Sequence, residues 1–476
     1  MPARAATVTG RHTRPHAPLG QAARNAASRI LVVGLNAAAG IVTARALNPD
    51  GRGISALAIA VAGATVSLGF LSVEQAHVQL WKGRRDAVIA NSVLLGPAVG
   101  AVAAIVGTAV VWLGAHFGVL DVHPGILLLA LAAVPASVTG LYLSTALVLD
   151  ARVSLVNRAM VWVGVLQCVV TFGMALTGSL TPGSVVAIWS GSAFAMLLVL
   201  LAGARPALRR RDPTLARQAL ALGVRLHPGS VALYLTYRLD VLVLGALATP
   251  TAVGLYALAV TVGELTRIPT EAVRGVFLPR QAEGDRAASA DVTAVATRVS
   301  VALAAVCVGG LCLVAPVLIP LAYGHDFADS VHALYALGPG LFMVQAGRQI
   351  GAYLIKHDRP FVVSALPTVA VLANAGANLL LIPRWGLIGC GLSASLGFTL
   401  MTVGQAVRFC RTTGVRWHRL LPGPGDVVLV RRRLASRRPA TAVAVPEHSP
   451  RQRSTAGTTA TDGDLVATPA DPDGRR

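Results

Sequence analysis

The chain has 476 residues, of which 54% are hydrophobic and only 13% are charged, and its mean hydropathy is +0.64. This composition leaves too little polar surface to cover a water-soluble globule of this size. The formal net charge of +20 lies in segments between apolar blocks and forms no basic patch interleaved with aromatic residues, which argues against a nucleic-acid partner.

Residues 1–28 form a basic segment without an acidic residue. A signal peptide is one interpretation, with Arg24 and Arg29 preceding an apolar run at residues 30–44. An uncleaved start that is anchored on the inner side of the membrane explains the same charges, and we favour it.

Repeated apolar stretches follow between residues 28 and 410, and each approaches the roughly 20 residues that cross the hydrocarbon core of a bilayer. We therefore predict an all-α polytopic membrane protein with about twelve transmembrane helices. The predicted spans are residues 29–48, 53–73, 88–116, 125–148, 156–178, 183–203, 227–249, 252–277, 299–322, 331–355, 361–382 and 386–410.

Basic residues in the loops alternate sharply along the chain. The loops after odd-numbered spans carry only Arg52 and Arg384. The loops after even-numbered spans carry Lys82, Arg84, Arg85, Arg152, Arg158, Arg205, Arg209, Arg210, Arg211, Arg217, Arg225, Arg280, Arg286, Arg298, Lys356 and Arg359. Because cytoplasmic loops are enriched in Lys and Arg, both termini are predicted to be cytoplasmic.

The two halves of the chain resemble each other. The segment GISALA at residues 53–58 aligns with GLYALA at residues 254–259, and Pro135 and Pro339 occupy spans of matching order. Six spans in each half give both halves the same orientation, so we predict two parallel six-helix repeats around a central cavity. Alanine-rich sequence also aligns with itself by chance, and this alternative stays open.

The segments of the chain are assigned as follows. They are residues 1–28, a cytoplasmic N-terminal segment; 29–203, a first six-helix lobe; 204–226, a cytoplasmic linker; 227–410, a second lobe; and 411–476, a cytoplasmic, basic and largely disordered tail. The amphipathic residues 215–226 are predicted to lie along the inner membrane surface. The polybasic residues 431–438 would favour the anionic headgroups of membrane lipids.

The eighth span carries a stripe of charges. Glu264, Arg267, Glu271 and Arg274 are separated by three, four and three residues, which places them on one helix face. Pro269 lies among them and predicts a kink. The stripe is either a self-neutralising ladder of ion pairs or the charged wall of a wet cavity.

The seventh and tenth spans contain further polar candidates. Arg238 and Asp240 are two residues apart, so their side chains point in nearly opposite directions and should have different partners. Gln345, Arg348 and Gln349 share one face, and a guanidinium group flanked by amides suits a phosphate or sugar hydroxyls. Snorkelling of Arg348 toward the inner interface is the alternative.

No pattern typical of catalysis is present. The sequence has no GxxxxGK[ST] loop, no Ser/His/Asp arrangement and no cluster with metal-ligand spacing, and its five cysteines are scattered and form no CxxC pair. The predicted outer loops are also short, which disfavours a membrane-bound polymerase or glycosyltransferase. We therefore predict a protein that is not an enzyme and has no cofactor and no metal site.

Four segments resemble one family. They are ARALNPDGRGISALA (44–58), LTYRLDVLVLGALATPTAVGLYALAVTVGEL (235–265), LAYGHDFADSVHALYALGPG (321–340) and NLLLIPRWGLIGCGLSASLG (378–397). In this order they resemble the polysaccharide transporter (Wzx-type flippase) family of the multidrug/oligosaccharidyl-lipid/polysaccharide exporter superfamily.

The resemblance implies a flippase in the bacterial plasma membrane that carries a polyprenyl-diphosphate-linked glycan outward by alternating access. It also implies glycan-assembly enzymes as partners. Arg238, Asp240, Glu264 and Arg267 occupy positions expected to line the cavity. A cation-coupled small-molecule or drug exporter of the same superfamily is the alternative, because the fold would be the same.

Overall fold

The computed structural model describes residues 18–118, 123–283, 285–358 and 360–423. These residues form α-helices and short 3₁₀ turns joined by brief connections, and none of them lies in a β-strand. The predicted N-terminal segment before residue 18 and the predicted tail after residue 423 lie outside the described residues.

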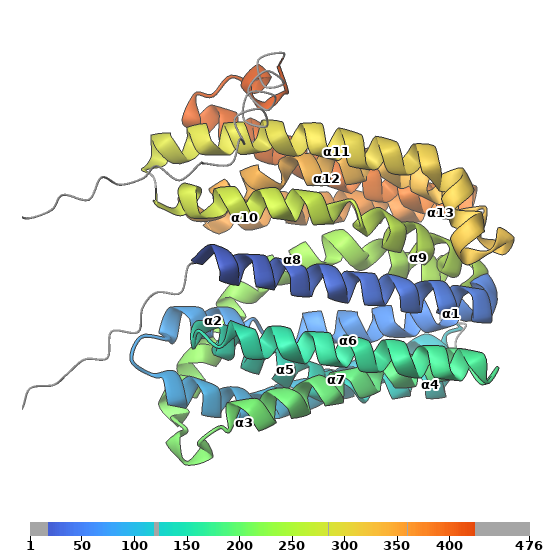
Figure 1. The fold of residues 1–476 in the computed structure, drawn as a ribbon, viewed down its shortest axis with the longest axis horizontal. Coiled ribbons are helices and arrows are strands. Elements are labelled where there is room, and N and C mark those ends of the chain that lie inside the picture. Colours follow the sequence, from blue (N-terminus) through green and yellow to red (C-terminus); the bar gives the residue numbers. More distant parts are fainter. Residues whose placement is uncertain (1–17, 119–122, 284, 359, 424–476) are drawn as a thin grey trace, which may run out of the picture. The chain divides into compact units, whose positions relative to one another are not determined.

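The long helices lie side by side (Figure 1). The helices of the first half are α1 (Pro18–Gly69), α2 (Val73–Leu80), α3 (Arg85–His116), α4 (Pro124–Leu131), α5 (Val134–Leu149), α6 (Val153–Leu176) and α7 (Pro182–Ala204). After the turn η1 (Leu208–Arg210), the second half contains α8 (Pro213–Leu247), α9 (Pro250–Glu264), α10 (Arg267–Glu283), α11 (Arg286–Tyr323), η2 (His325–Phe327), α12 (Ser330–His357), α13 (Pro360–Thr413) and η3 (Trp417–Leu420).

Twelve segments of the described chain are long enough to span a membrane, as predicted. Nine helical stretches meet this criterion by length and apolar composition. Two of them, Ala27–Gly69 and Val363–Thr413, contain a non-helical residue, Asn48 and Gly386 respectively, and so supply two spans each. The 28-residue helix α12 supplies the remaining span.

The helix that contains the seventh span begins much earlier than the sequence suggested, and its 35 residues exceed the length that crosses a bilayer. Asp212 caps α8 by accepting hydrogen bonds from the backbone N–H groups of Thr214 and Leu215, and Pro213 takes the first helical position. Residues 215–226 are therefore continuous with the following span, and the prediction that they form a separate surface segment is wrong. Leu215 is fully buried against helices of the first half.

Prolines divide two spans into two helices each. Pro135 has no N–H to donate to Leu131, and α4 ends at this leucine. Pro269 likewise cannot donate to Leu265, and the chain breaks between α9 and α10 at Leu265 and Thr266. The kink predicted at Pro269 is therefore present, one turn before the proline itself.

The two halves meet most closely where α1 crosses α9. A Cβ atom on Gly53 would lie 1.8 Å from the carbonyl oxygen of Pro250, and one on Gly254 would lie 1.9 Å from that of Pro49. Only glycine allows the two backbones to approach this closely. These are the two glycines that the repeat aligns, so equivalent residues of the two lobes face each other across their junction, which supports the parallel repeat.

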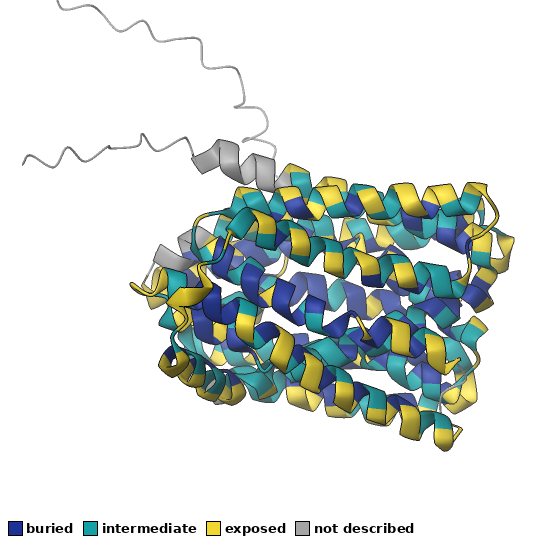
Figure 2. Ribbon diagram, turned by 90° about the horizontal axis from the view of Figure 1, so that it is seen from below, coloured by how far each residue is buried: buried dark blue, intermediate teal, exposed yellow. Residues whose placement is uncertain are grey.

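The outer faces of the helices are apolar. Figure 2 shows exposed residues along the outward sides of the helices and buried residues between them. Leu176, Val306 and Leu313 are among the most exposed large hydrophobic residues. Such faces suit a hydrocarbon environment, and together with the spans they define a multi-pass membrane protein.

Candidate functional site

Three arginine side chains converge on the carboxylate of Glu271 in α10. Arg348 from α12 donates a hydrogen bond from Nη1 to Glu271 Oε1 at 2.8 Å. Arg267, one turn before Glu271, places Nε 3.4 Å from Oε1, and Arg274, one turn after it, places Nη1 3.9 Å from Oε2. We call Arg267, Glu271, Arg274 and Arg348 the arginine cluster. One carboxylate serves three guanidinium groups, so the cluster has a formal charge of +2.

A buried amide fixes the orientation of Arg348. Gln345 Oε1 accepts hydrogen bonds from Arg348 Nε at 3.2 Å and Nη2 at 2.9 Å, and another from Thr270 Oγ1 at 2.9 Å. Gln345 and Thr270 are both buried. The guanidinium plane of Arg348 is therefore held by α12 and α10 together, and Nη1 is directed at Glu271.

Arg238 and Asp240 have different partners, as their spacing predicted. Arg238 Nη2 lies 2.9 Å from Glu264 Oε1, and this ion pair is half-exposed. The carboxylate of Asp240 is buried, and it accepts hydrogen bonds from the Tyr256 hydroxyl and from the backbone N–H of Val241. The two side chains thus serve separate parts of the site.

These groups border a small pocket of about 50 Å³. Its lining residues are Tyr237, Asp240, Val260, Glu264, Arg267, Leu337, Leu341, Val344, Gln345, Arg348 and Phe398. All belong to α8, α9, α10, α12 and α13, so the pocket lies within the second lobe. The sequence left two interpretations of the charges on residues 264–274 open, a ladder of ion pairs or the wall of a wet cavity. In the structure Glu271 pairs with arginines of its own helix and with Arg348 of α12, because α10 packs against α11 and α12.

The eight candidate residues form one connected site. Those that line the pocket are Asp240, Glu264, Arg267, Gln345 and Arg348. The other three, Arg238, Glu271 and Arg274, are linked to it through the ion pairs with Glu264 and within the arginine cluster. Gln349 instead donates to Ser300 Oγ at 3.3 Å and lies outside the site.

Four aromatic or hydroxyl-bearing residues of the site escaped the sequence interpretation. Tyr237 and Phe398 both line the pocket, with ring centres 5.4 Å apart. Tyr256 donates to Asp240, and Thr270 donates to Gln345. Tyr237 and Tyr256 stand close to candidate residues in the sequence, but only the packing of α8, α9 and α13 shows what they contact.

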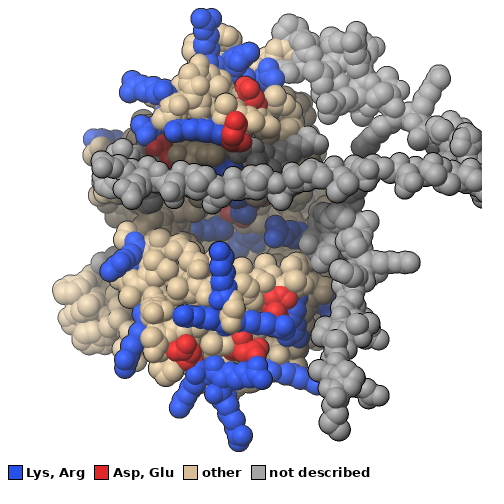
Figure 3. Space-filling model, turned by 90° about the vertical axis from the view of Figure 1, so that its left-hand side faces the viewer, with Lys and Arg blue, Asp and Glu red and all other residues tan. Residues whose placement is uncertain are grey.

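The charged side chains of the site differ in how far they are exposed. The side chains of Arg267 and Arg238 keep 57% and 39% of their surface exposed, whereas Arg348 keeps 13%. Figure 3 shows the end of the molecule where α10 and α12 finish, with Lys and Arg side chains around both groups of helices and further charged side chains in the recess between them. An anionic group entering there would meet positive charge first.

Residues 42–332 match the family model described as polysaccharide biosynthesis protein. This segment is more than half of the 476 residues and includes α8, α9 and α10 of the site. The chain belongs to this family of polysaccharide biosynthesis proteins. No curated protein has a sequence that matches it.

The fold of this polysaccharide biosynthesis protein is similar to that of solved transporters. An inward-facing multidrug resistance MATE family transporter of the MOP superfamily aligns with a TM-score of 0.63 and 15% identity, covering 80% of this chain and 94% of that one. The lipid II flippase MurJ, in an inward closed conformation, aligns with a TM-score of 0.62 and 11% identity, covering 84% and 89%. A MATE transporter of Vibrio cholerae, VcmN, gives 0.55 and 12%, covering 83% and 96%. At these identities the likeness concerns the fold.

Two arginines of α1 contact the second lobe at the end of α11. Arg45 donates from Nε to the carbonyl oxygen of Ala322 at 2.8 Å and from Nη2 to that of Leu321 at 2.6 Å. These carbonyls belong to the last turn of α11, where they lack partners within the helix. Arg52, which is buried, lies 5.9 Å from the ring centre of Tyr323. This junction holds the lobes together beside the crossing of α1 and α9.

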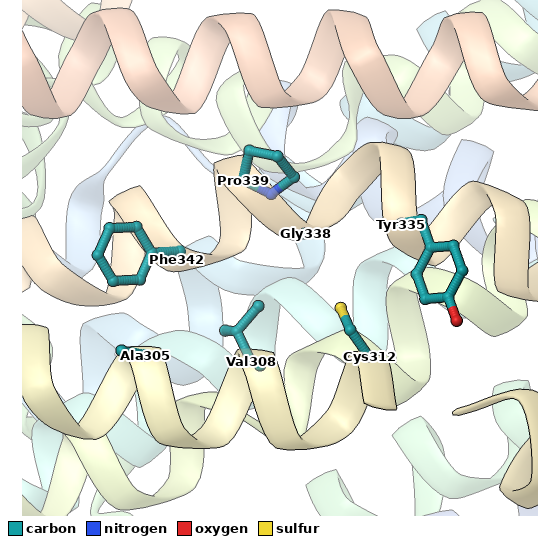
Figure 4. Close-up of a pocket in the computed structure, with 8 residues that line it drawn as sticks. Ala305, Val308, Cys312, Tyr335, Gly338, Pro339 and Phe342 are labelled. Carbon is teal, nitrogen blue, oxygen red and sulfur yellow. The ribbon is translucent and has the colours of Figure 1, made fainter. Parts of the chain in front are cut away.

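A second pocket of the polysaccharide biosynthesis protein is larger and apolar. It has a volume of about 340 Å³ and lies between α11 and α12. Figure 4 shows Val308 and Cys312 of α11 opposite Pro339 and Phe342 of α12. No charged side chain lines it, so within the described residues it offers van der Waals contact and no recognition of an ionic group.

Proposed function

We propose that this polysaccharide biosynthesis protein is a flippase, which moves a lipid-linked oligosaccharide or polysaccharide precursor from the inner to the outer leaflet by alternating access. The observation that carries the proposal is the arginine cluster inside predicted spans. The family and the transporter fold are consistent with it. The activity is transport and requires no cofactor.

The charge of the cluster fits the proposed cargo. An ionised side chain at membrane depth is costly unless it is paired or reaches water, so an excess of guanidinium groups there needs a reason. Guanidinium groups bind phosphate oxygens through two parallel hydrogen bonds. A polyprenyl-diphosphate-linked glycan presents such oxygens at the membrane surface, and the half-exposed Arg267 and Arg274 are open to them.

The proposal includes an orientation and partners. The protein would lie in the plasma membrane of a bacterium with both termini in the cytoplasm, and the alternation of basic loops supports this orientation. The lobes at residues 29–203 and 227–410 would move against each other, while residues 1–28, 204–226 and 411–476 stay on the cytoplasmic side. Glycan-assembly enzymes would act before and after the transported precursor, and anionic lipid headgroups would contact the basic tail.

The test is translocation of a fluorescent lipid-diphosphate-oligosaccharide in proteoliposomes. Wild type is compared with Arg238→Ala, Glu264→Gln and Arg348→Ala, all checked for insertion and folding. We expect transport by wild type and at least a tenfold loss in Arg348→Ala, since this arginine makes the shortest ion pair of the cluster. A wild type that moves no lipid-linked glycan of its host would refute the proposal.

A cation-coupled small-molecule exporter is the second candidate, and one observation favours it. Asp240 is a buried carboxylate that accepts hydrogen bonds from a hydroxyl and a backbone N–H, and no ion pair joins it to another described residue. A carboxylate of this kind can bind a proton or a small cation. Export of organic cations without transport of lipid-linked glycan, abolished by Asp240→Asn, would favour this function over the flippase.

A further inference from the structure

The arginine cluster contains more cations than anions, and its three ion pairs differ in length. Glu271 approaches Arg348 at 2.8 Å, but its contacts with Arg267 and Arg274 are 3.4 and 3.9 Å long. An ion pair between hydrogen-bonded guanidinium and carboxylate groups is normally shorter than about 3 Å. Two of the three guanidinium groups therefore keep donors that Glu271 does not satisfy well, and both are more exposed than Arg348.

We propose that Glu271 is a built-in counter-anion, which holds the three guanidinium groups while the site is empty and is replaced there by the diphosphate group of the substrate. Glu271 then takes up a proton from water. This inference rests on the proposed function and names the group of the substrate that the site recognises.

The formal charges fit a diphosphate diester. The three arginines carry +3 and Glu271 carries −1, which leaves +2. A diphosphate that joins a lipid to a sugar is a diester with two negative charges, so with Glu271 protonated its binding lowers the net charge of the cluster from +2 to +1. A phosphate diester with one negative charge would leave the net charge at +2, and an organic cation would be repelled.

Replacement links binding of the anion to binding of a proton. Once the guanidinium groups turn to the diphosphate, Glu271 loses its cationic partners and lies beside two negative charges, and both changes favour its protonated form. The groups that face it are Arg267 and Arg274 of α10, Arg348 of α12 and Tyr237 of α8. The nearby carboxylate of Glu264 is already paired with Arg238. Because the bound state holds the extra proton, affinity should rise as the pH falls.

The experiment measures binding of uridine diphosphate glucose, a soluble diphosphate diester, to the full chain in neutral detergent by calorimetry. Its charge does not change near neutral pH, because a diester lacks the second phosphate proton. For wild type we expect the affinity to increase by up to about tenfold for each unit by which the pH is lowered from about 7.5 to about 5.5, because tenfold per unit is the limit for one linked proton. Glu271→Gln should bind about tenfold more tightly at the higher pH and show little dependence on pH.

The control is Asp291→Asn, which removes one negative charge from an exposed position on α11. It should retain both the affinity and the pH dependence of wild type. If Glu271→Gln is not recovered folded, Glu271→Asp replaces it: the shorter side chain competes less well, so binding should be tighter and still depend on pH. Weaker or unchanged binding in these variants, or a full pH dependence in Glu271→Gln, would overturn the proposal.

Two further measurements are needed. The first distinguishes a diphosphate site from a phospholipid site, and the second separates a failure of the proposal for Glu271 from a failure of the proposed flippase function. Phosphatidylglycerol added at the concentration of the probe should displace little of it; full displacement would assign the arginines to a membrane phospholipid and overturn the inference. Translocation of lipid-linked glycan is measured on the same preparations. If wild type transports the glycan but Glu271→Gln binds the probe as wild type does, only the role of Glu271 as counter-anion is refuted. If binding of the probe depends on pH and on Glu271 as expected but wild type transports no glycan, only the proposed flippase function is refuted.

Discussion

The two lobes share a repeat, but they differ in where they hold their charges. Among the described residues, the ion pairs of the first half lie at helix ends, where Arg85 meets Asp150 and Arg210 meets Asp86. In the second half, the Arg238–Glu264 pair and the arginine cluster lie within predicted spans. The described ion pairs of the first lobe therefore lie at helix ends, whereas those of the candidate site lie along the helices of the second lobe.

The residues that set the helix crossing are present in both lobes, whereas the charged residues of the site are present in only one. Counted from the aligned glycines at 53 and 254, the first-lobe positions that correspond to Glu264, Arg267 and Glu271 are Gly63, Val66 and Phe70. The repeat thus preserves the residues that set helix crossings and has lost, or never had, the charges in the first lobe. An anionic group is then recognised by one lobe, and closure against the other can exclude water without a second set of charges.

The shared feature, the glycine crossing, should give the largest effect on stability. Gly53→Ala would place a methyl carbon 1.8 Å from the oxygen of Pro250, and Gly254→Ala one 1.9 Å from that of Pro49. We expect each to lower the free energy of unfolding by about 3 kcal/mol or more. Thermal denaturation in detergent, followed by circular dichroism, measures this loss.

Gly34→Ala in α1 is the matched control, because no atom lies within 4 Å of its added carbon. It should be neutral or stabilising by about 0.5–1 kcal/mol, since alanine favours a helix more than glycine does. A severe loss in Gly53→Ala with none in Gly254→Ala would show that the two positions are not equivalent and would break the comparison of the lobes.

The sequence predicts the helices and their repeat better than it predicts the contacts within the candidate site. Span lengths, the Gly53–Gly254 alignment and the i, i+3 and i+4 spacing of the charges follow from helix geometry, so they are visible in the sequence. The capture of Glu271 by Arg348 joins residues 77 positions apart and depends on how α10 packs against α12. The continuity of α8 through residues 215–226 depends on a cap at Asp212 that the amphipathic pattern concealed.

The next largest effect is expected on substrate binding, from a substitution in the arginine cluster of the second lobe. Arg348→Ala removes a hydrogen-bonded, mostly buried guanidinium group, and we expect substrate binding to weaken by roughly 2–3 kcal/mol. Arg158→Ala, which removes an exposed arginine of the first lobe, should leave transport nearly unchanged. Initial rates in proteoliposomes, measured over a range of lipid-linked glycan concentrations, make this comparison. Equal losses in both variants would show that the charges act through the overall potential and not through one site.

The first lobe has a carboxylate of its own outside the spans, and it should respond to pH. Burial raises the pKa of Glu74 in α2 from 4.5 to about 7. The native state holds this proton more tightly than the unfolded chain, so its stabilisation is full below about pH 4.5 and is lost as the pH rises to about 7. After allowance for partial exposure, wild type should lose about 2 kcal/mol over this interval. Denaturation across the interval should show this loss in wild type and not in Glu74→Gln; identical profiles would contradict it.

The smallest effect should come from the Arg238–Glu264 pair, and its size tests whether burial distinguishes the charges within the second lobe. Both side chains are half-exposed, so water competes for them. A double-mutant cycle with Arg238→Ala and Glu264→Gln, based on free energies of unfolding, should therefore give a coupling energy of about 1 kcal/mol or less. The same cycle on Arg348 and Glu271, whose side chains are 13% and 27% exposed, should give a larger coupling, because fewer water molecules replace the lost partner. Equal couplings would mean that both pairs stand in the same aqueous surroundings. The arginine cluster would then owe its attraction for an anion to its unequal number of charges alone.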